Sequence, residues 1–149
     1  LVDRADSTYL HSVGKNNVIV NNVFANYNHG LVRSRDESPD LSFVVERNVF
    51  WSGEQEVLLD WQGRQGYAFG RNLYWCTGGE VLFNKQSFAA WQALGHDRGS
   101  VVADPLFVDP DSGDFRLAPG SPALQVGFVP FSVADAGPRR PPGAGSAGS

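Results

Sequence analysis

The clearest pattern along the chain is a short apolar segment that recurs about every 25 residues. Three such segments align without gaps, at Val18–Phe24, Val44–Phe50 and Ala68–Tyr74. An asparagine holds the same place in each of them, at positions 22, 48 and 72, so the spacings are 26 and 24 residues. A second apolar series follows eight residues behind the first, and its members are Leu31–Ser34, Val57–Asp60 and Val81–Asn84.

Both series predict short β-strands that stack in parallel coils. Their residues are mostly β-branched or aromatic, and the segments between turns are too short for a helix of useful length. A repeat of this length is typical of a parallel β-solenoid, in which successive coils pair at about 4.8 Å. We therefore expect Asn22, Asn48 and Asn72 to form one column of mutually bonded amides. Three asparagine turns in a β-sandwich remain the alternative, whereas a leucine-rich repeat is disfavoured because its Leu-x-x-Leu-x-Leu pattern is missing.

The character of the sequence changes after the repeats and divides the chain into three parts. Residues 1–86 are predicted to form about three coils. Residues 87–136, rich in prolines and aspartate turns, are predicted to form an irregular cap over the open end of the solenoid. A short helix inside this cap should begin after Ser87 and end before Gly95. Residues 137–149, rich in proline and then in glycine and serine, are expected to be a disordered tail.

Composition narrows the function classes. The chain is 42% hydrophobic, and 12 basic residues stand against 16 acidic ones, for a net charge of -4. This mild acidity favours neither nucleic acid nor a membrane surface as partner, and no apolar run reaches the roughly 18 residues of a membrane span. The single cysteine excludes a disulfide framework and a cysteine-based zinc site, and we expect no metal and no cofactor. The chain begins with Leu1 and contains no methionine, so we expect it to be part of a longer protein.

Several segments resemble right-handed parallel β-helix proteins of the pectate-lyase-like superfamily. The resemblance covers residues 9–131 and is strongest at the C-terminal end of that fold. The segments that carry it are Trp91–Asp97, Asp104–Pro110, Asp114–Leu117 and Pro119–Leu124, with His11, Gly14–Asn17, Asn21–Ala25 and Arg33–Glu37 as coil sequence. It implies an all-β, right-handed parallel β-helix and a secreted or periplasmic glycoside hydrolase or polysaccharide lyase. It also implies a polysaccharide or oligosaccharide partner and further N-terminal coils of the same protein.

Candidate site residues gather around the second series. If Val32 points inward, Arg33 and Arg35 point outward, and a ribbon of such side chains along stacked strands suits an extended sugar polymer. On this hypothesis Arg33, Arg35 and Trp61 bind substrate. The catalytic candidates are His11, whose ordinary pKa suits proton transfer, and the carboxylates Glu37 and Asp60, because glycoside hydrolysis requires two carboxyl groups. A solvated edge with local ion pairs is the alternative for the ribbon, and a turn-bonded histidine is the alternative for His11.

For several other residues, a structural role is a better explanation than a functional one. Trp51 and Trp75 occupy equivalent places in consecutive repeats, which is commoner in core packing than in a sugar platform. Asp97 is interpreted as a turn or cap partner. The aspartates at 104, 109, 111 and 114 miss the spacing of a calcium loop and are good turn formers. Two functions therefore stay open: part of a polysaccharide-degrading enzyme that supplies one wall of a glycan cleft, or a non-catalytic glycan-binding or structural module.

Overall fold

The computed structural model describes residues 1–6, 8–11, 17–34, 43–59, 61 and 66–132 of the chain. Its main strands form three sheets. Sheet A contains, in spatial order, β1 (Val2–Asp3), β4 (Val23–Ala25), β7 (Val49–Ser52), β10 (Leu73–Cys76) and β13 (Val101–Val102). Sheet B contains β2 (Thr8–His11), β5 (Leu31–Ser34), β8 (Glu56–Leu59), β11 (Leu82–Phe83) and β12 (Gln86–Ser87). Sheet C contains β3 (Asn17–Val20), β6 (Phe43–Glu46) and β9 (Tyr67–Gly70).

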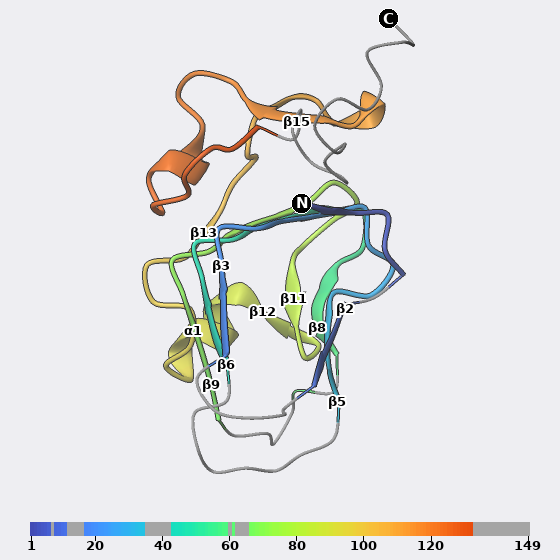
Figure 1. The fold of residues 1–149 in the computed structure, drawn as a ribbon. Coiled ribbons are helices and arrows are strands. Elements are labelled where there is room, and N and C mark those ends of the chain that lie inside the picture. The colour runs from blue at the N-terminus through green and yellow to red at the C-terminus, as the bar shows by residue number, and fades with distance from the viewer. Residues whose placement is uncertain (7, 12–16, 35–42, 60, 62–65, 133–149) are drawn as a thin grey trace, which may run out of the picture.

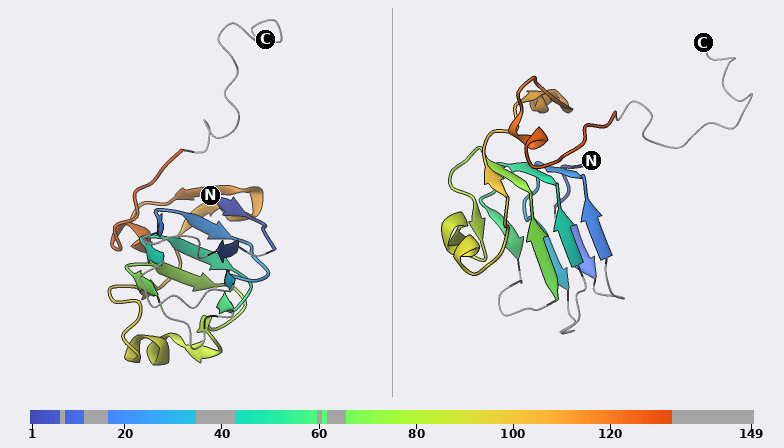
Figure 2. Two further views of the ribbon diagram at one scale, coloured as in Figure 1. Left: turned by 60° about the horizontal axis from the view of Figure 1, so that its bottom comes forward. Right: turned by 90° about the vertical axis from the view of Figure 1, so that its left-hand side faces the viewer.

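The chain visits these sheets in a fixed order, A then B then C, and each passage is called a circuit here. The strands β1–β3, β4–β6 and β7–β9 make three circuits, and β10 and β11 begin a fourth. Neighbouring circuits pair in parallel in all three sheets (Figures 1 and 2). The prediction of a mostly β fold with parallel strands and one short helix, α1 (Phe88–Ala93), is confirmed.

The asparagine column is present as predicted. The side-chain amide of Asn22 donates to Oδ1 of Asn48 at 3.3 Å, and that of Asn48 donates to Oδ1 of Asn72 at 3.2 Å. Each Oδ1 also accepts the backbone N–H of the preceding asparagine, at 2.9 and 3.0 Å. Asn48 and Asn72 are completely buried, which is tolerable because an amide carries both donors and acceptors.

The second series has a different register from the one expected. Leu31 pairs with Leu58, and Leu58 with Phe83, so the true alignment lies one residue away from Leu31–Val57. All three of these paired side chains are buried. The expected alignment put Phe83 level with Arg33, a position that should face outward, and this part of the predicted ribbon is wrong because Phe83 faces the core. An all-apolar run such as Val57–Leu59 has no polar position to fix its register, and a slip of one residue reverses the two faces.

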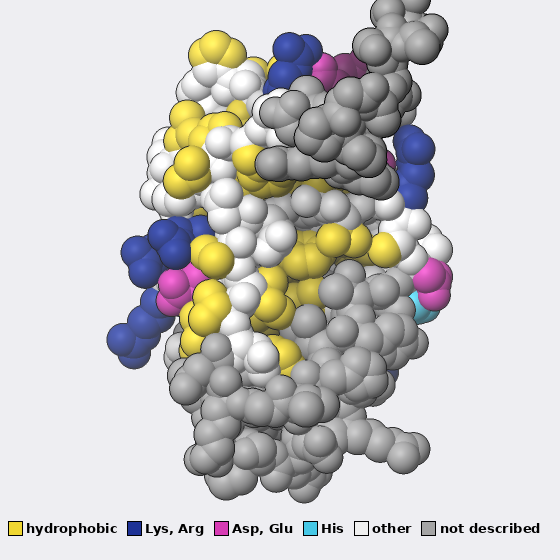
Figure 3. All heavy atoms as spheres, in the orientation of Figure 1, with side chains coloured by type: hydrophobic (Ala, Val, Ile, Leu, Met, Phe, Trp, Pro, Cys, Tyr) yellow, Lys and Arg dark blue, Asp and Glu magenta, His cyan; other side chains and the backbone are white. Residues whose placement is uncertain are grey.

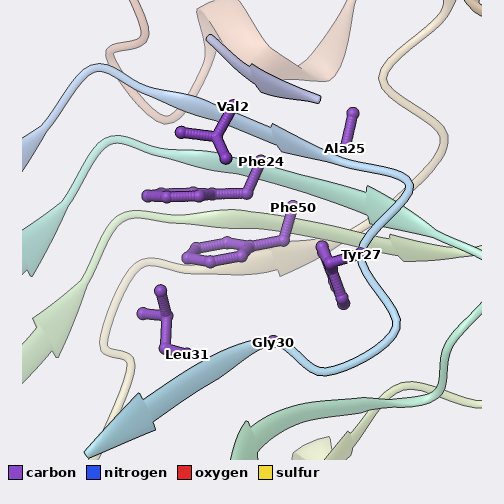
Figure 4. A pocket seen from close by; sticks show the side chains of 7 residues that line it. All are labelled: Val2, Phe24, Ala25, Tyr27, Gly30, Leu31 and Phe50. Atoms are coloured by element: carbon purple, nitrogen blue, oxygen red, sulfur yellow. The ribbon is translucent and has the colours of Figure 1, made fainter. Parts of the chain in front are cut away.

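Aromatic side chains of sheet A stack inside the molecule. The rings of Phe24 and Phe50 lie 4.9 Å apart, and those of Phe50 and Tyr74 lie 5.0 Å apart, both nearly parallel. Beside this column lies a small cavity of about 10 Å³, lined also by Val2, Leu31 and Gly30 (Figure 4). A Cβ at Gly30 would lie 1.9 Å from a backbone oxygen, that of Val57, so only glycine fits where these two circuits approach.

Residues 86–100 close one end of the stack. Helix α1 begins as predicted, with Ser87 Oγ accepting the N–H of Ala90 at 3.2 Å. The indole of Trp91 stacks on Phe83 with 5.6 Å between ring centroids. Asp97 ends the asparagine column, because its Oδ1 accepts the side-chain amide of Asn72 at 3.2 Å. This confirms the interpretation of Asp97 as a cap partner.

The later part of the predicted cap does not cover that end. It contains the hairpin of β14 (Phe107–Asp109) and β15 (Asp114–Leu117), with the 3₁₀ turns η1 (Pro110–Ser112) and η2 (Pro122–Leu124). This segment, residues 103–131, is called the strap here. Its apolar side chains, including Ala123, Val126 and Phe128, pack on Val23, Val49 and Leu73 of sheet A. The strap therefore covers the outer face of sheet A, where these three residues form a second apolar surface. The predicted tail at 137–149 lies outside the described residues.

The opposite end of the stack carries strand edges. Among the described strands, β1, β2 and β3 are the last members of their sheets. Seen from this end, apolar side chains are visible between the sheets (Figure 3). No helix in the described part of the chain is long and apolar enough to cross a membrane.

Candidate functional site: an aromatic groove on sheet A

A groove lies between the outer face of sheet A and the strap. Its volume is about 520 Å³. We call it the aromatic groove, and its lining residues are Trp51, Trp75, Thr77, Asp104, Leu106, Phe107, Val108, Pro110 and Ala118. Two adjacent strands, β7 and β10, supply the floor, and the strap supplies the rim.

Strand alternation places the two tryptophans on this face. In β7, Phe50 points into the inner core, whereas Val49 and Trp51 lie on the side that the strap covers. Trp51 and Trp75 are register partners, so the prediction that they occupy equivalent places is confirmed. Both are half-buried. Their side chains therefore leave part of their aromatic surface accessible in the groove.

The strap holds Trp51 more firmly than Trp75. The rings of Phe107 and Phe115 meet Trp51 edge-on, at centroid distances of 6.1 and 6.2 Å. Such edge contacts stabilise an aromatic ring beyond the area that it buries. Trp51 is thus a fixed part of the floor, and Trp75 extends that floor toward Thr77.

Leu106, on the rim of the groove, has an unusual backbone conformation. This residue has φ 59°, in the left-handed region that costs an ordinary side chain about 1 kcal/mol or more, yet its side chain is 41% exposed. Its N–H donates to Asp104 Oδ1 at 2.9 Å, and its carbonyl accepts the N–H of Ala118 at 2.8 Å. The predicted turn-forming role of Asp104 is confirmed. These two hydrogen bonds hold the left-handed backbone in place and leave the Leu106 side chain at the rim of the groove.

The groove combines chemistry that suits a ligand with both apolar and polar surfaces. Tryptophan faces bind the apolar faces of rings, and the Asp104 carboxylate and the Thr77 hydroxyl can accept or donate hydrogen bonds at the edge. Ligand sites in general are apolar hollows with a few placed polar groups. Within the described residues, no group of three histidine, cysteine or acidic side chains is arranged to hold a metal ion.

Of the residues predicted to bind substrate, Trp61 requires a correction. Its side chain is completely buried, and its Nε1 donates to the carbonyl of Leu31 at 2.8 Å. Its ring packs edge-on against Tyr67 and Phe69, at 4.8 and 5.2 Å. Trp61 is a core residue and presents no surface to a substrate, because this large apolar ring fills the space between sheets B and C.

Of the other predicted site residues, the structure brings only Arg33 and His11 onto neighbouring strands. Arg33 and His11 lie in β5 and β2, where Arg33 pairs with Leu10 and His11 with Ser34, and their side chains lie outside the described part. Arg35, Glu37 and Asp60 lie wholly outside the described residues. Their roles remain predictions.

One carboxylate outside the groove has a perturbed environment. Burial raises the pKa of Glu56, and hydrogen bonds from the backbone, including the Lys85 N–H at 2.9 Å, partly oppose this shift. Its other oxygen, Oε1, is buried and has no hydrogen-bond partner among the described residues. Glu56 begins β8 and is not part of the groove lining.

Comparisons with known proteins identify one relative. The chain is 30% identical over 92 residues to a protein of Bacillus subtilis strain 168 that carries the name Uncharacterized protein YwoF. The match spans 56% of this chain but only 20% of the relative, so the chain corresponds to about a fifth of that protein. No family model matches the sequence, and no solved structure matches it.

Proposed function

We propose that this chain is the glycan-binding, C-terminal part of a carbohydrate-active parallel β-helix protein, and that the aromatic groove is its glycan site. Three observations support the β-helix: the fixed order of the three sheets, the parallel pairing of successive circuits, and the in-register asparagine column. The same proposal includes further circuits N-terminal to β1, β2 and β3, and a location outside the cytoplasm.

The observation that carries glycan binding is the pair of register-matched tryptophans in an accessible groove. Trp51 and Trp75 lie on adjacent strands, about 4.8 Å apart along the stack, and so offer consecutive aromatic surfaces to an extended ligand. The strap fixes Trp51, so little side-chain entropy is lost when a ring stacks on this floor.

The groove favours binding over cleavage. Glycoside hydrolysis requires two carboxyl groups that flank the scissile bond, but the groove lining contains a single one, Asp104. One oxygen of Asp104 already accepts the N–H of Leu106. The non-catalytic function is therefore the better supported of the two that the sequence left open, as far as the described residues go.

Substitution of Trp75 tests this proposal. Binding of the full chain to a panel of soluble glycans, both neutral and acidic, is measured by calorimetry and by affinity electrophoresis. Trp75→Ala should weaken binding roughly tenfold or more, because it removes a large apolar contact surface. Trp75→Phe should restore much of the affinity. Leu94→Ala removes an exposed apolar side chain at the C-cap of α1, outside the groove lining, and is the matched control.

Two results would overturn the proposal. One is that the wild-type chain binds none of the glycans at millimolar concentration. The other is that Trp75→Ala, shown to be folded by circular dichroism, binds them as tightly as the wild type.

A further inference from the structure

The lining of the aromatic groove carries one charged side chain, and it is negative. Asp104 is the acidic residue, and none of the lining residues is an arginine, a lysine or a histidine. Asp104 takes no part in the ion pairs found among the described residues. An anionic ligand in the groove would therefore meet a carboxylate without a basic partner, whereas a cationic ligand would complete an ion pair.

The backbone places Asp104 beside the strand that carries Trp75. The N–H of Ala103 donates to the carbonyl of Tyr74 at 3.1 Å, which brings Ala103 level with Trp75 in the parallel register of β13 and β10. Asp104 is the next residue, at the start of the strap. Its side chain is exposed, and its Oδ1 accepts the N–H of Leu106 at 2.9 Å, so the carboxylate has a fixed place at the rim.

The aromatic floor attracts the same kind of ligand. The face of an aromatic ring is electron-rich, and the indole of tryptophan binds a cation over its face better than the other aromatic side chains do. Trp51 and Trp75 are register partners, and both keep part of their surface accessible in the groove. An indole face and a carboxylate in one groove therefore suit an alkylammonium group, which both of them attract.

We propose that the aromatic groove selects glycans that carry protonated amino groups, such as polymers of amino sugars. This selectivity rests on the proposed function, because it concerns the glycan site itself. In an amino sugar the ammonium group and the apolar face belong to one rigid ring. A ring that stacks on Trp75 can therefore place its ammonium group toward Asp104 with little further loss of conformational freedom. A lysine side chain would have to order a long flexible stem for the same two contacts, which disfavours a basic peptide.

The test compares three hexasaccharides that share one backbone and one type of linkage. They differ in a single substituent of each ring, which is a hydroxyl in cellohexaose, a protonated amine in the hexamer of glucosamine, and a neutral acetamide in the hexamer of N-acetylglucosamine. Binding to the full chain is measured by calorimetry at about pH 5.5, where aspartates are ionised and the sugar amines are protonated. Hexalysine and choline represent cations that are not sugars.

Two variants separate the charge of the groove from the charge of the whole chain. Asp104→Asn removes the negative charge but keeps an oxygen that can accept the N–H of Leu106. Asp6→Asn removes an exposed negative charge outside the groove lining and keeps an acceptor for the amide of Asn28, so it is the matched control.

The wild type should bind all three hexamers, and the glucosamine hexamer roughly tenfold more tightly than either neutral one. Asp104→Asn should reduce this ratio of affinities to less than about threefold, whereas Asp6→Asn should leave it at about tenfold. Higher salt should weaken binding of the glucosamine hexamer more than binding of cellohexaose.

Equal affinity for the three hexamers, a preference that survives Asp104→Asn, or an equal loss of preference in both variants would overturn the selectivity. Tighter Asp104-dependent binding of hexalysine or choline than of the glucosamine hexamer would also overturn it. Binding of the neutral hexamers that requires Trp75 but shows no preference for the amine would leave the glycan site standing and overturn its selectivity alone. Absence of binding to any hexamer would overturn both, so the two failures are distinguishable.

Discussion

The two ends of the strand stack are built from the same repeat but finish differently. At one end, the column that contains Asn48 and Asn72 terminates on a carboxylate, Asp97, beneath a capped helix. At the other end, Asn22 donates to the column, but no described residue donates to its Oδ1, and three strands end in unpaired edges. The end at Asp97 is therefore closed by a specific structure. The end at β1, β2 and β3 has the same unpaired strand edges and asparagine that a circuit in the middle of the stack would offer to its neighbour.

This difference shows how a repeat is stopped. Parallel strands offer the same hydrogen-bonding edge at every level, so the pairing continues unless a different structure satisfies the last donors. Here Asp97 accepts from Asn72, from the Tyr74 hydroxyl at 2.8 Å and from Ser100 Oγ at 2.7 Å. Its second oxygen accepts Trp91 Nε1 at 2.6 Å. One buried side chain thus satisfies donors from two circuits and from the helix.

Removal of Asp97 should have the largest effect on stability. Asp97→Ala leaves the buried donors of Tyr74 and Trp91 without an acceptor, and we expect the free energy of unfolding to fall by about 3–5 kcal/mol. Urea unfolding, followed by tryptophan fluorescence, measures the change. Asp114→Ala is the control, because Asp114 pairs with an exposed arginine on the strap and its loss should lower the free energy of unfolding far less than the loss of Asp97. Equal costs for the two variants would show that Asp97 does not terminate the stack.

Replacement of a column asparagine by alanine should lower the free energy of unfolding by an amount that depends on the position of that asparagine in the column. Asn48 is completely buried and its amide also donates to the Ile19 carbonyl at 2.9 Å, so Asn48→Ala should cost about 2–3 kcal/mol. Asn22 is only half-buried at the other end of the column, and Asn22→Ala should cost about 1 kcal/mol. Urea unfolding of the two variants provides the comparison. A larger cost at Asn22 would reverse the assignment of the two ends.

The smallest expected effect is a pH dependence of the free energy of unfolding, caused by His96 at the end of the stack that residues 86–100 close. The ring of His96 stacks on Trp91 at 4.0 Å and lies 5.4 Å from Tyr67, and this partial burial lowers its pKa, although the neighbouring Asp97 opposes the shift. Because the folded state disfavours the protonated ring, this contribution to stability is complete above the ordinary pKa of about 6.5. It is lost as the pH falls through the lower pKa of the folded state.

Comparison with His96→Gln isolates this contribution from the carboxylates that titrate in the same range. Between pH 7.5 and 4.5, the wild type should lose more stability than the variant in urea unfolding. Parallel pH profiles for the two proteins would contradict the assignment.

The sequence predicted the parts of this fold that polar residues fix. The asparagine column, the start of α1 and the role of Asp97 follow from side chains whose hydrogen bonds allow few arrangements. The register of the second series could not be predicted from Val57–Leu59, because each of these side chains fits either face. Trp61 was wrongly predicted to face a substrate for the same reason, because its predicted place depended on the register of this series. The path of the strap over sheet A depends on contacts between residues about 100 positions apart, such as Asn21 and Val129, for which the local pattern holds no signal.

The candidate sites were partly visible in the sequence. The repeated places of Trp51 and Trp75 were recognised, but their accessibility depends on the strap. The sequence also does not reveal the left-handed backbone at the corners of the stack, where Arg47 and Arg71 have φ 53° and 49°.

Native-state hydrogen exchange tests most directly the claim that the stack is closed at one end and open at the other. The amides of Arg71 and Leu73, which bond to neighbouring levels near Asp97, should exchange slowest. Protection should then decrease level by level toward the amide of Arg4 and the strands β1, β2 and β3. Equal protection along the stack, or slower exchange in β1–β3 than in β9 and β10, would contradict the account.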